Sequence, residues 1–253
     1  MAISSAVPVA IRKRSIAPAS ADPEALATPE TALTNDRLYT RKRVACGEAL
    51  YRAGGHFDSL YAVRSGFFKI TATLEDGRDQ VTGFHMAGEV LGLDGIDSER
   101  HVSDAIALED SEVCIIPYAW ITERGLQRLL YRVMSRELVR DQGAMLLLGT
   151  MCSTERLAAF LLNLSRRFVA RGFSPHEFRL RMTRGEIGSY LGLSLETVSR
   201  LFSRFQDERL VTVDRKHILI HDIEGLKAVL GRTDPPASAT RRNGFGAPLS
   251  HGM

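Results

Sequence analysis

The chain has 253 residues, of which 44% are hydrophobic and 25% are charged, and its formal net charge is +3. This length allows two domains with a sizeable core, and the composition is that of a soluble globular protein. No apolar run approaches the ~20 residues that span a bilayer, so no membrane contact is expected, and three cysteines without a pairing pattern indicate a reducing compartment, the cytoplasm.

The two ends of the chain have the composition of disordered segments. Residues 1–35 are rich in Ala, Ser and Pro, and residues 233–253 are rich in Pro, Gly, Ser and Arg. Such segments bury too little apolar surface to fold. We therefore expect a disordered N-terminal extension over 1–35 and a disordered tail over 233–253.

Residues 36–120 have the pattern of a strand-rich domain. Apolar and polar residues alternate in short runs such as 60–63 and 113–116, and Gly and Asp interrupt these runs. Asp76-Gly77 is a typical tight hairpin turn. Many short strands at this spacing predict an antiparallel sandwich or barrel.

Residues 121–153 change to a helical period. Apolar positions recur in steps of four and three, as in the a/d seam of a coiled coil, at Met134, Leu138, Asp141, Met145, Leu148 and Cys152. The seam predicts that this helix pairs with a second copy of itself; the alternative is a helix that packs on its own domain. Asp141 is the exception, because two carboxylates facing each other in a desolvated seam cost free energy. Either Arg136 or Arg140 neutralises it, or it weakens the dimer and acts as a switch.

The following segment is helical and basic. A second helix is expected over residues 154–169, followed by a turn at 171–175. Residues 166–216 contain eleven Lys or Arg and six Asp or Glu, although the net charge of the whole chain is small. A local surplus of positive charge of this kind suits contact with phosphates. The alternative is a basic surface without a partner.

Residues 182–211 have the pattern of a helix-turn-helix. Thr183 and Glu186 form a capping box at the start of a short helix, which Gly192 ends as a left-handed cap. Ser194 caps a second helix with Val198, Leu201 and Phe205 on its inner face. The segments 211–213 and 217–220 then predict a small hairpin closed at residues 214–215, which makes the motif winged.

The second helix carries side chains suited to reading bases. Glu196, Ser199 and Arg200 share its outer face at offsets of three and four. Arg can donate to guanine and Glu can accept from cytosine in the major groove. The alternative is a solvated amphipathic helix with an i,i+4 ion pair. The candidate DNA contacts are Thr183, Arg184, Ser194, Glu196, Thr197, Ser199, Arg200 and Arg204.

The order of these parts, with the passages 60–66, 80–89, 155–168 and 182–211, resembles the CRP/FNR family of bacterial transcription regulators, and most closely its FNR branch. The resemblance implies an α+β fold. Its parts are an N-terminal antiparallel β-roll of cupin-like and cyclic-nucleotide-binding-like form over 36–120, a dimerisation helix over 121–153, and a winged helix-turn-helix domain over 154–232. It also implies a homodimer without enzymatic activity, bound to double-stranded DNA at a TTGAT-NNNN-ATCAA palindrome.

The resemblance assigns roles to single residues. Glu196 is expected on cytosine, Arg200 on guanine and Ser199 on thymine. Asp141 matches an acidic residue that keeps the oxygen sensor of this branch monomeric until its cluster assembles. Contacts with RNA polymerase are expected from two surface loops, at Asp94, Gly95 and Ile96 and at Gly172, Phe173 and Ser174.

The iron–sulfur pattern of the branch is incomplete. Oxygen sensing there depends on a 4Fe–4S cluster held by three cysteines near the N-terminus and a fourth in the strand domain. Cys114 occupies the fourth position, but residues 1–45 contain no cysteine, and Cys46 and Cys152 lie on other elements. A cluster needs four ligands held close around it. No cluster is therefore expected, and Cys114 is interpreted as a small buried hydrophobic residue.

Other cofactors are not expected either. Residues 88–92 begin like the phosphate cassette of cyclic-nucleotide-binding domains, but Leu93 replaces its Glu, and 101–105 lack its Arg. A buried phosphate would then lack a charged partner. His85 is interpreted as a hydrogen-bonded strand residue rather than a haem ligand. No metal site and no catalytic set is found, so the sequence predicts a regulator and not an enzyme.

Three hypotheses about control stay open. The regulator is active by default, or it senses an effector in the β-roll, or it responds to thiol oxidation at Cys152, which would control dimerisation. A more remote alternative is an interaction module with a degenerate helix-turn-helix, against which the intact set of Glu196, Ser199 and Arg200 argues.

Overall fold

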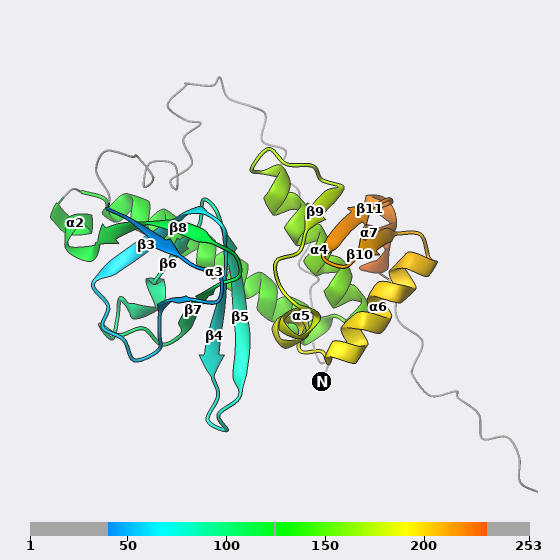
Figure 1. Cartoon of the computed structure of the whole chain (residues 1–253), viewed down its shortest axis with the longest axis horizontal. Coiled ribbons are helices and arrows are strands. Elements are labelled where there is room, and N and C mark those ends of the chain that lie inside the picture. The colour runs from blue at the N-terminus through cyan, green and yellow to red at the C-terminus, as the bar shows by residue number, and fades with distance from the viewer. Residues whose placement is uncertain (1–39, 124, 232–253) are drawn as a thin grey trace, which may run out of the picture.

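The computed structural model describes residues 40–123 and 125–231, and the two ends predicted to be disordered lie outside these ranges. Within them, a strand-rich domain, a long helix and a C-terminal domain follow one another (Figure 1), which confirms the predicted fold class. No helix in this part of the chain combines the length and apolar character needed to cross a bilayer.

The strand-rich domain is a β-roll of two four-stranded antiparallel sheets. One sheet has the order β1-β8-β3-β6 and the other the order β2-β7-β4-β5. Alternate residues of both sheets face inward, and the core between the sheets includes Val63, Phe68 and Val113. The strands are β1 (Thr40–Val44), β2 (Ala49–Tyr51), β3 (Ser59–Ser65), β4 (Phe67–Thr73), β5 (Asp79–Met86), β6 (Val90–Leu91), β7 (Asp104–Ala107) and β8 (Ser111–Pro117).

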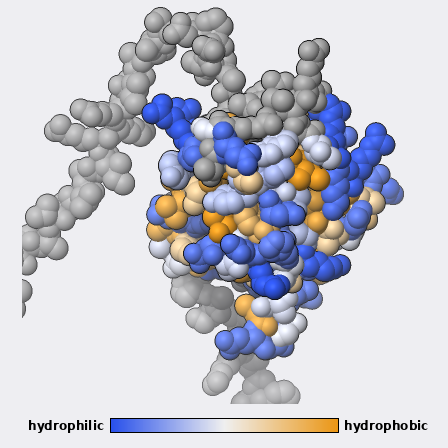
Figure 2. All heavy atoms as spheres, turned by 90° about the vertical axis from the view of Figure 1, so that its left-hand side faces the viewer, coloured by the Kyte–Doolittle hydropathy of each residue, from blue (hydrophilic) through white to orange (hydrophobic). Residues whose placement is uncertain are grey.

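Glycines with positive φ form turns between strands of the β-roll. Gly77 has φ +80° in the hairpin between β4 and β5, as the Asp-Gly pair predicts. Gly66 has φ +97° between β3 and β4, and a Cβ there would lie 2.7 Å from the Cα of Ser111, so no other residue fits without displacement of the backbone. Figure 2 shows the end of the β-roll that lies on the left in Figure 1, where hydrophobic residues are interspersed among hydrophilic ones.

The helix expected over 121–153 is two helices. α2 (Tyr118–Glu123) and α3 (Gln127–Thr150) are separated by Gly125, which has φ +67°. This left-handed conformation interrupts the helical hydrogen bonds, and a pattern of apolar positions does not reveal it. Near its start, α3 packs Leu130 and Val133 against the β-roll, and it then runs on to the C-terminal domain (Figure 1).

The C-terminal domain combines helices with a small sheet. Its elements are α4 (Ser153–Val169), β9 (Glu177–Arg179), α5 (Arg184–Leu191), α6 (Leu195–Asp207), β10 (Val211–Asp214), β11 (His217–Ile220) and α7 (Ile223–Val229). The predicted wing is present, but its turn lies at Arg215 and Lys216, one residue later than expected, because Asp214 pairs with His217. The pattern missed β9 and α7, which are short and depend on packing against β11 and α4.

The β-roll and the C-terminal domain share one hydrophobic core. The ring of Phe84 on β5 lies 6.1 Å from the ring of Phe160 on α4 and 5.3 Å from that of Tyr190 on α5. Polar contacts add to this: Lys69 Nζ on β4 lies 2.8 Å from Glu186 Oε1 on α5. The backbone N–H of Val81 donates to Ser189 Oγ at 2.8 Å. The C-terminal domain is therefore docked on the hairpin of β4 and β5.

Candidate DNA-reading surface

The helix-turn-helix has the predicted caps. Thr183 Oγ1 accepts a hydrogen bond from the N–H of Glu186 at 3.2 Å, and Glu186 Oε2 accepts from the N–H of Thr183 at 2.7 Å. Gly192 ends α5 with φ +64°, and Ser194 Oγ accepts from the N–H of Thr197 at 3.1 Å at the start of α6. Both ends of the turn are thereby fixed by local chemistry.

The inner face of α6 anchors the helix in the core. Val198, Phe202 and Phe205 are buried against residues of α5 such as Ile187 and Leu191. The period of 3.6 residues then leaves the predicted reading residues on the opposite side. Phe202 was not among the residues predicted for this inner face, although its large apolar side chain in an amphipathic helix was an available signal.

The reading residues are displayed outward. Glu196 and Arg200 are exposed and Ser199 is half-buried. Hydrogen bonds from its own backbone N–H and from Ser194 lower the pKa of Glu196, so its carboxylate is ionised and acts as an acceptor. Arg200 Nη2 lies 3.4 Å from Thr197 Oγ1, and the positive charge of Arg200 adds to the lowering of the pKa of Glu196.

Two candidate DNA contacts have partners within the protein. The guanidinium of Arg184 lies 3.6 Å above the centre of the Phe202 ring, and burial lowers its pKa. Arg204 Nε donates to Glu208 Oε1 at 2.8 Å, and its Nη1 donates to Thr154 Oγ1 at 3.3 Å. These contacts stabilise α6 against α5 and α4, so the structure gives both arginines a role in orienting the helix.

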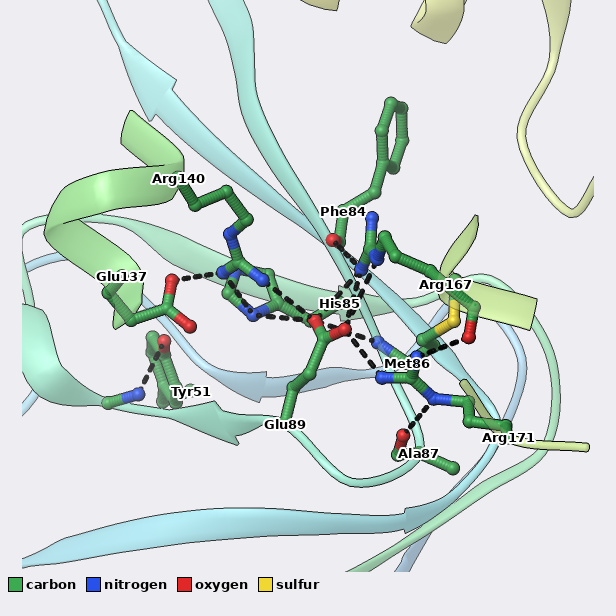
Figure 3. A network of polar contacts seen from close by, with 11 residues as sticks. Tyr51, Phe84, His85, Met86, Ala87, Glu89, Glu137, Arg140, Arg167 and Arg171 are labelled. Atoms are coloured by element: carbon green, nitrogen blue, oxygen red, sulfur yellow. Dashed lines mark hydrogen bonds and ion pairs between the residues drawn. The ribbon is translucent and has the colours of Figure 1, made fainter. Parts of the chain in front are cut away.

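A buried ionic cluster that was not predicted from the sequence lies between the β-roll and the helices. Glu89, in the turn between β5 and β6, contacts Arg140 of α3, Arg167 of α4 and Arg171 just beyond α4 (Figure 3). His85 accepts a hydrogen bond from Arg140 Nη2 at 3.1 Å, and Glu137 also pairs with Arg140. The only signal in the sequence was a surplus of arginine in α4, because the partners are far apart along the chain.

Burial and the neighbouring charges shift the pKa values of His85, Glu89 and Glu137. Burial, and then Arg140, lower the pKa of His85 to about 3. Burial would raise the pKa of Glu89, but Arg167, Arg140 and Arg171 outweigh it and lower the value to about 2. For Glu137 burial outweighs Arg140 and raises the pKa to about 7. At neutral pH, His85 is therefore neutral and Glu89 is charged.

Acid is expected to destabilise the fold through His85. Because its pKa falls below the ordinary value of 6.5 on folding, its contribution to stability is lost as pH falls below that value. Glu89 loses its contribution below its ordinary value of 4.5, whereas Glu137 loses its contribution as pH rises from 4.5 towards 7. Comparison with a His85→Gln variant isolates the histidine, because both proteins share the two carboxyl groups.

Between about pH 6 and pH 4, the free energy of unfolding should fall more steeply in the natural protein than in His85→Gln, by about 1.4 kcal/mol per pH unit. Gln does not titrate and can still accept the hydrogen bond of Arg140. Urea unfolding at closely spaced pH values measures both slopes. Parallel slopes would contradict a histidine that is neutral in the folded protein.

The loops expected to contact RNA polymerase differ in exposure. Asp94 is turned inward, because its Oδ2 accepts hydrogen bonds from the N–H groups of Val102 and Ser103 at 3.0 and 3.1 Å. Gly95 is buried against Phe57 and Ile96 is half-buried, so residues 97–100 are the exposed part of this loop. Gly172, Phe173 and Ser174 are exposed.

The three cysteines do not fit a 4Fe–4S cluster. Cys46 is exposed in the turn after β1, Cys114 is buried in β8, and Cys152 is half-buried before α4. Among residues 40–123 and 125–231, no group of three or more His, Cys, Asp or Glu side chains is arranged to hold a metal ion. Four converging ligands are needed, and thiols on three separate elements do not provide them.

The residues do not fit a cyclic phosphate either. In segment 101–105, the N–H groups of Val102 and Ser103 already donate to Asp94, and so does Ser103 Oγ at 2.7 Å. His101 is buried, with its ring stacked 3.7 Å from that of Tyr51 and its Nδ1 lying 3.2 Å from Asp94. A phosphate placed here would meet a carboxylate instead of free donors.

The predicted dimer seam is exposed along α3. Met134, Leu138, Met145 and Leu148 are between 40% and 73% exposed, and Asp141 is exposed with them. Cys152 is not part of this helix, which ends at Thr150; it caps α4 instead, where its N–H donates to Glu155 Oε2 at 2.9 Å. Arg140 makes its ion pairs with Glu89 and Glu137, and Asp141 also attracts it electrostatically.

Comparisons with known proteins agree with this architecture. The chain matches two family models: that of the cyclic nucleotide-binding domain over residues 41–123 and that of the Crp-like helix-turn-helix domain over residues 155–229. The chain is 47% identical over 204 residues to the fumarate and nitrate reduction regulatory protein of Salmonella typhimurium, covering 78% of this chain and 82% of that relative. It is 50% identical over 190 residues to the transcriptional activator protein Anr of Pseudomonas protegens, covering 73% and 78%.

A solved structure extends the comparison to three dimensions. FixK2 from Bradyrhizobium japonicum superposes with a TM-score of 0.71 at 28% identity, covering 78% of this chain and all of that one. The two family matches cover both the β-roll and the helix-turn-helix. The chain therefore belongs to the CRP/FNR family and is a transcription regulator with a helix-turn-helix DNA-binding domain, not an enzyme.

Proposed function

We propose that the protein is a regulator of FNR type that binds, as a homodimer, to a palindrome similar to TTGAT-NNNN-ATCAA. The observation that carries this proposal is the outward display of Glu196, Ser199 and Arg200 on α6, a helix whose inner face and caps are fixed. By resemblance to the FNR branch, these side chains read cytosine, thymine and guanine. An ionised Glu and an exposed arginine on the same face suit that assignment.

The homodimer is supported by the exposed seam of α3. Apolar side chains of this size are seldom exposed together on a surface without a partner. The heptad spacing suits a second copy of the same helix, and two copies present two α6 helices to a palindrome. We further propose contacts with RNA polymerase through residues 97–100, in the loop before β7, and residues 172–174, in the turn after α4. Both segments are exposed.

We also propose that DNA binding needs no iron–sulfur cluster. The test is fluorescence anisotropy of the aerobically purified, iron-free protein on the palindrome and on a scrambled duplex at the same salt concentration. Tight binding to the palindrome alone is the expected result. Equal binding to both duplexes would contradict the proposal and would direct the search to an effector or a thiol that must first close the dimer.

Replacing Asp141 with Ala should strengthen the dimer. Two seam carboxylates repel each other when the helices pair, and Arg140 is already bound to Glu89. The expected change is a dissociation constant lower by about tenfold, measured by sedimentation equilibrium. Gln142→Ala, on an exposed neighbour that lies off the seam, is the matched control and should have little effect. A weaker Asp141→Ala dimer would show that the carboxylate has a favourable partner in the other subunit.

A further inference from the structure

One buried carboxylate joins three parts of the molecule. Glu89 is 8% exposed in the turn between β5 and β6. Its Oε1 accepts from Arg171 Nη2 at 2.7 Å and from Arg167 Nη2 at 2.9 Å, and its Oε2 accepts from Arg140 Nη1 at 2.9 Å. Figure 3 shows these guanidinium groups approaching Glu89 from both sides. The β-roll is thereby connected to α3 and, separately, to α4.

The hydrogen bonds of Arg167 and Arg171 fix the orientation of their guanidinium groups as well as their distance from Glu89. Arg167 Nη2 also donates to the carbonyl oxygen of Phe84 at 2.7 Å, and Arg171 Nε donates to that of Ala87. Both arginines are thus held by a carboxylate and by the strand backbone beside it. Charge-assisted hydrogen bonds with several donors fix the orientation of planar groups. Glu89 therefore holds α3 and α4 from the side of the β-roll, in addition to the direct contact of Arg156 of α4 with Leu148 O at the end of α3, at 2.8 Å.

The angle between α3 and α4 decides where α6 lies in a dimer. If two chains pair along α3, the orientation of α4 relative to α3 places each α6 relative to the dimer axis. Helix-turn-helix dimers bind half-sites at a separation that follows from this placement. A loosened angle would lower the effective concentration of the second α6 at its half-site without changing what either helix reads.

We propose that Glu89 is a positioning residue for DNA binding, which sets, through Arg140, Arg167 and Arg171, the half-site spacing that the dimer selects. The inference rests on the proposed dimeric function and adds to it the residue that controls spacing. Glu89 lies in the β-roll, between β5 and β6, and is not part of the helix-turn-helix.

The test compares spacing preference with half-site affinity. Glu89→Gln keeps the shape of the side chain and removes its charge. Fluorescence anisotropy of the full chain is measured on palindromes with spacers of two to six base pairs and on a duplex with a single half-site. The preference for the four-base-pair spacer over its neighbours should fall by about tenfold, while single half-site affinity stays within about twofold.

A matched control is available in the same domain. Glu112 also lies among three arginines, Arg41, Arg43 and Arg64, at 3.9, 3.9 and 3.2 Å, but all of them belong to the β-roll. Glu112→Gln should therefore keep the spacing preference. Arg140→Met removes the connection of Glu89 to α3, together with the contacts of Arg140 with His85 and Glu137, and leaves Arg167 and Arg171 on Glu89. It should lower the preference as Glu89→Gln does, which keeps the inference testable if Glu89→Gln fails to fold.

The outcomes are separable. A change in dimer strength alone cancels in the ratio between spacers, because it affects every palindrome equally. An unchanged ratio in folded Glu89→Gln or Arg140→Met protein would overturn the inference, as would equal losses on palindromes and on the single half-site. If the natural protein itself shows no preference for the four-base-pair palindrome, the proposed function fails first, and this inference fails with it.

Discussion

Gly188→Ala should destabilise the C-terminal domain by roughly 3 kcal/mol and remove most DNA binding. A Cβ at this position would lie 2.5 Å from the backbone carbonyl oxygen of Leu193, in the turn between α5 and α6. That turn is closed by the N–H of Leu193, which donates to the carbonyl oxygen of Gly188 at 2.8 Å. Backbone cannot move aside as a flexible side chain can, so the added methyl group must displace α6 from α5.

The same helix provides the control. At Gly185, a Cβ would meet only Leu195 Cδ1 at 3.8 Å and Thr183 Oγ1 at 3.9 Å, which are ordinary contacts. Gly185→Ala should be neutral or stabilising by up to about 1 kcal/mol, because alanine favours the helix. Urea unfolding and anisotropy on the palindrome measure both variants. Equal effects of the two substitutions would show that the helical propensity of the residue, and not the approach of the turn, governs this site.

The helix-turn-helix could be predicted from the sequence because its determinants are local. Thr183 with Glu186, Gly192 and Ser194 act within three or four residues, and each has the predicted conformation or hydrogen bond. The hairpin at Gly77 has the same explanation. Local hydrogen bonds and a requirement for positive φ select particular residue types at neighbouring positions in the sequence, so they can be predicted without the tertiary structure.

The Glu89 cluster could not be predicted, because its members are brought together only by the tertiary fold. Arg140 lies 51 residues from Glu89 along the chain, and Arg167 lies 78 residues from it. The break at Gly125 was missed for a different reason: the helix expected over 121–153 was based on the period of its apolar positions, and that period does not show the left-handed conformation of Gly125. The inward turn of Asp94 depends on Val102 and Ser103, which come from the other end of the same loop.

The Glu89 cluster and the contacts with α5 give the β-roll a structural role in the protein. Lys69 and Ser189 connect it directly to α5, and Phe84 extends its core into α4. The β-roll is therefore a platform on which the C-terminal domain is docked. The residues that dock it are distinct from those that we propose to read bases, so the two sets can be substituted separately.

Arg200→Ala should cost ~1–3 kcal/mol on a single half-site and about twice that on the palindrome, because each subunit contributes one α6. Arg200 is exposed, and its only described hydrogen bond is the long one to Thr197, so the guanidinium is available for two donor contacts with guanine. Anisotropy on duplexes that carry each base in turn at the guanine position measures the discrimination, which should disappear at that base pair only.

The control for this variant is Arg209→Gln, which removes the same charge from an exposed residue beyond the end of α6. Any loss of binding there should be equal on all sequences, because a general contribution to phosphate attraction carries no base preference. If Arg200→Ala also weakens every duplex equally and lowers the salt dependence by about one counterion, then Arg200 contacts a phosphate. In that case base reading would depend on Glu196 and Ser199, and the guanine in each half-site would be recognised by another residue.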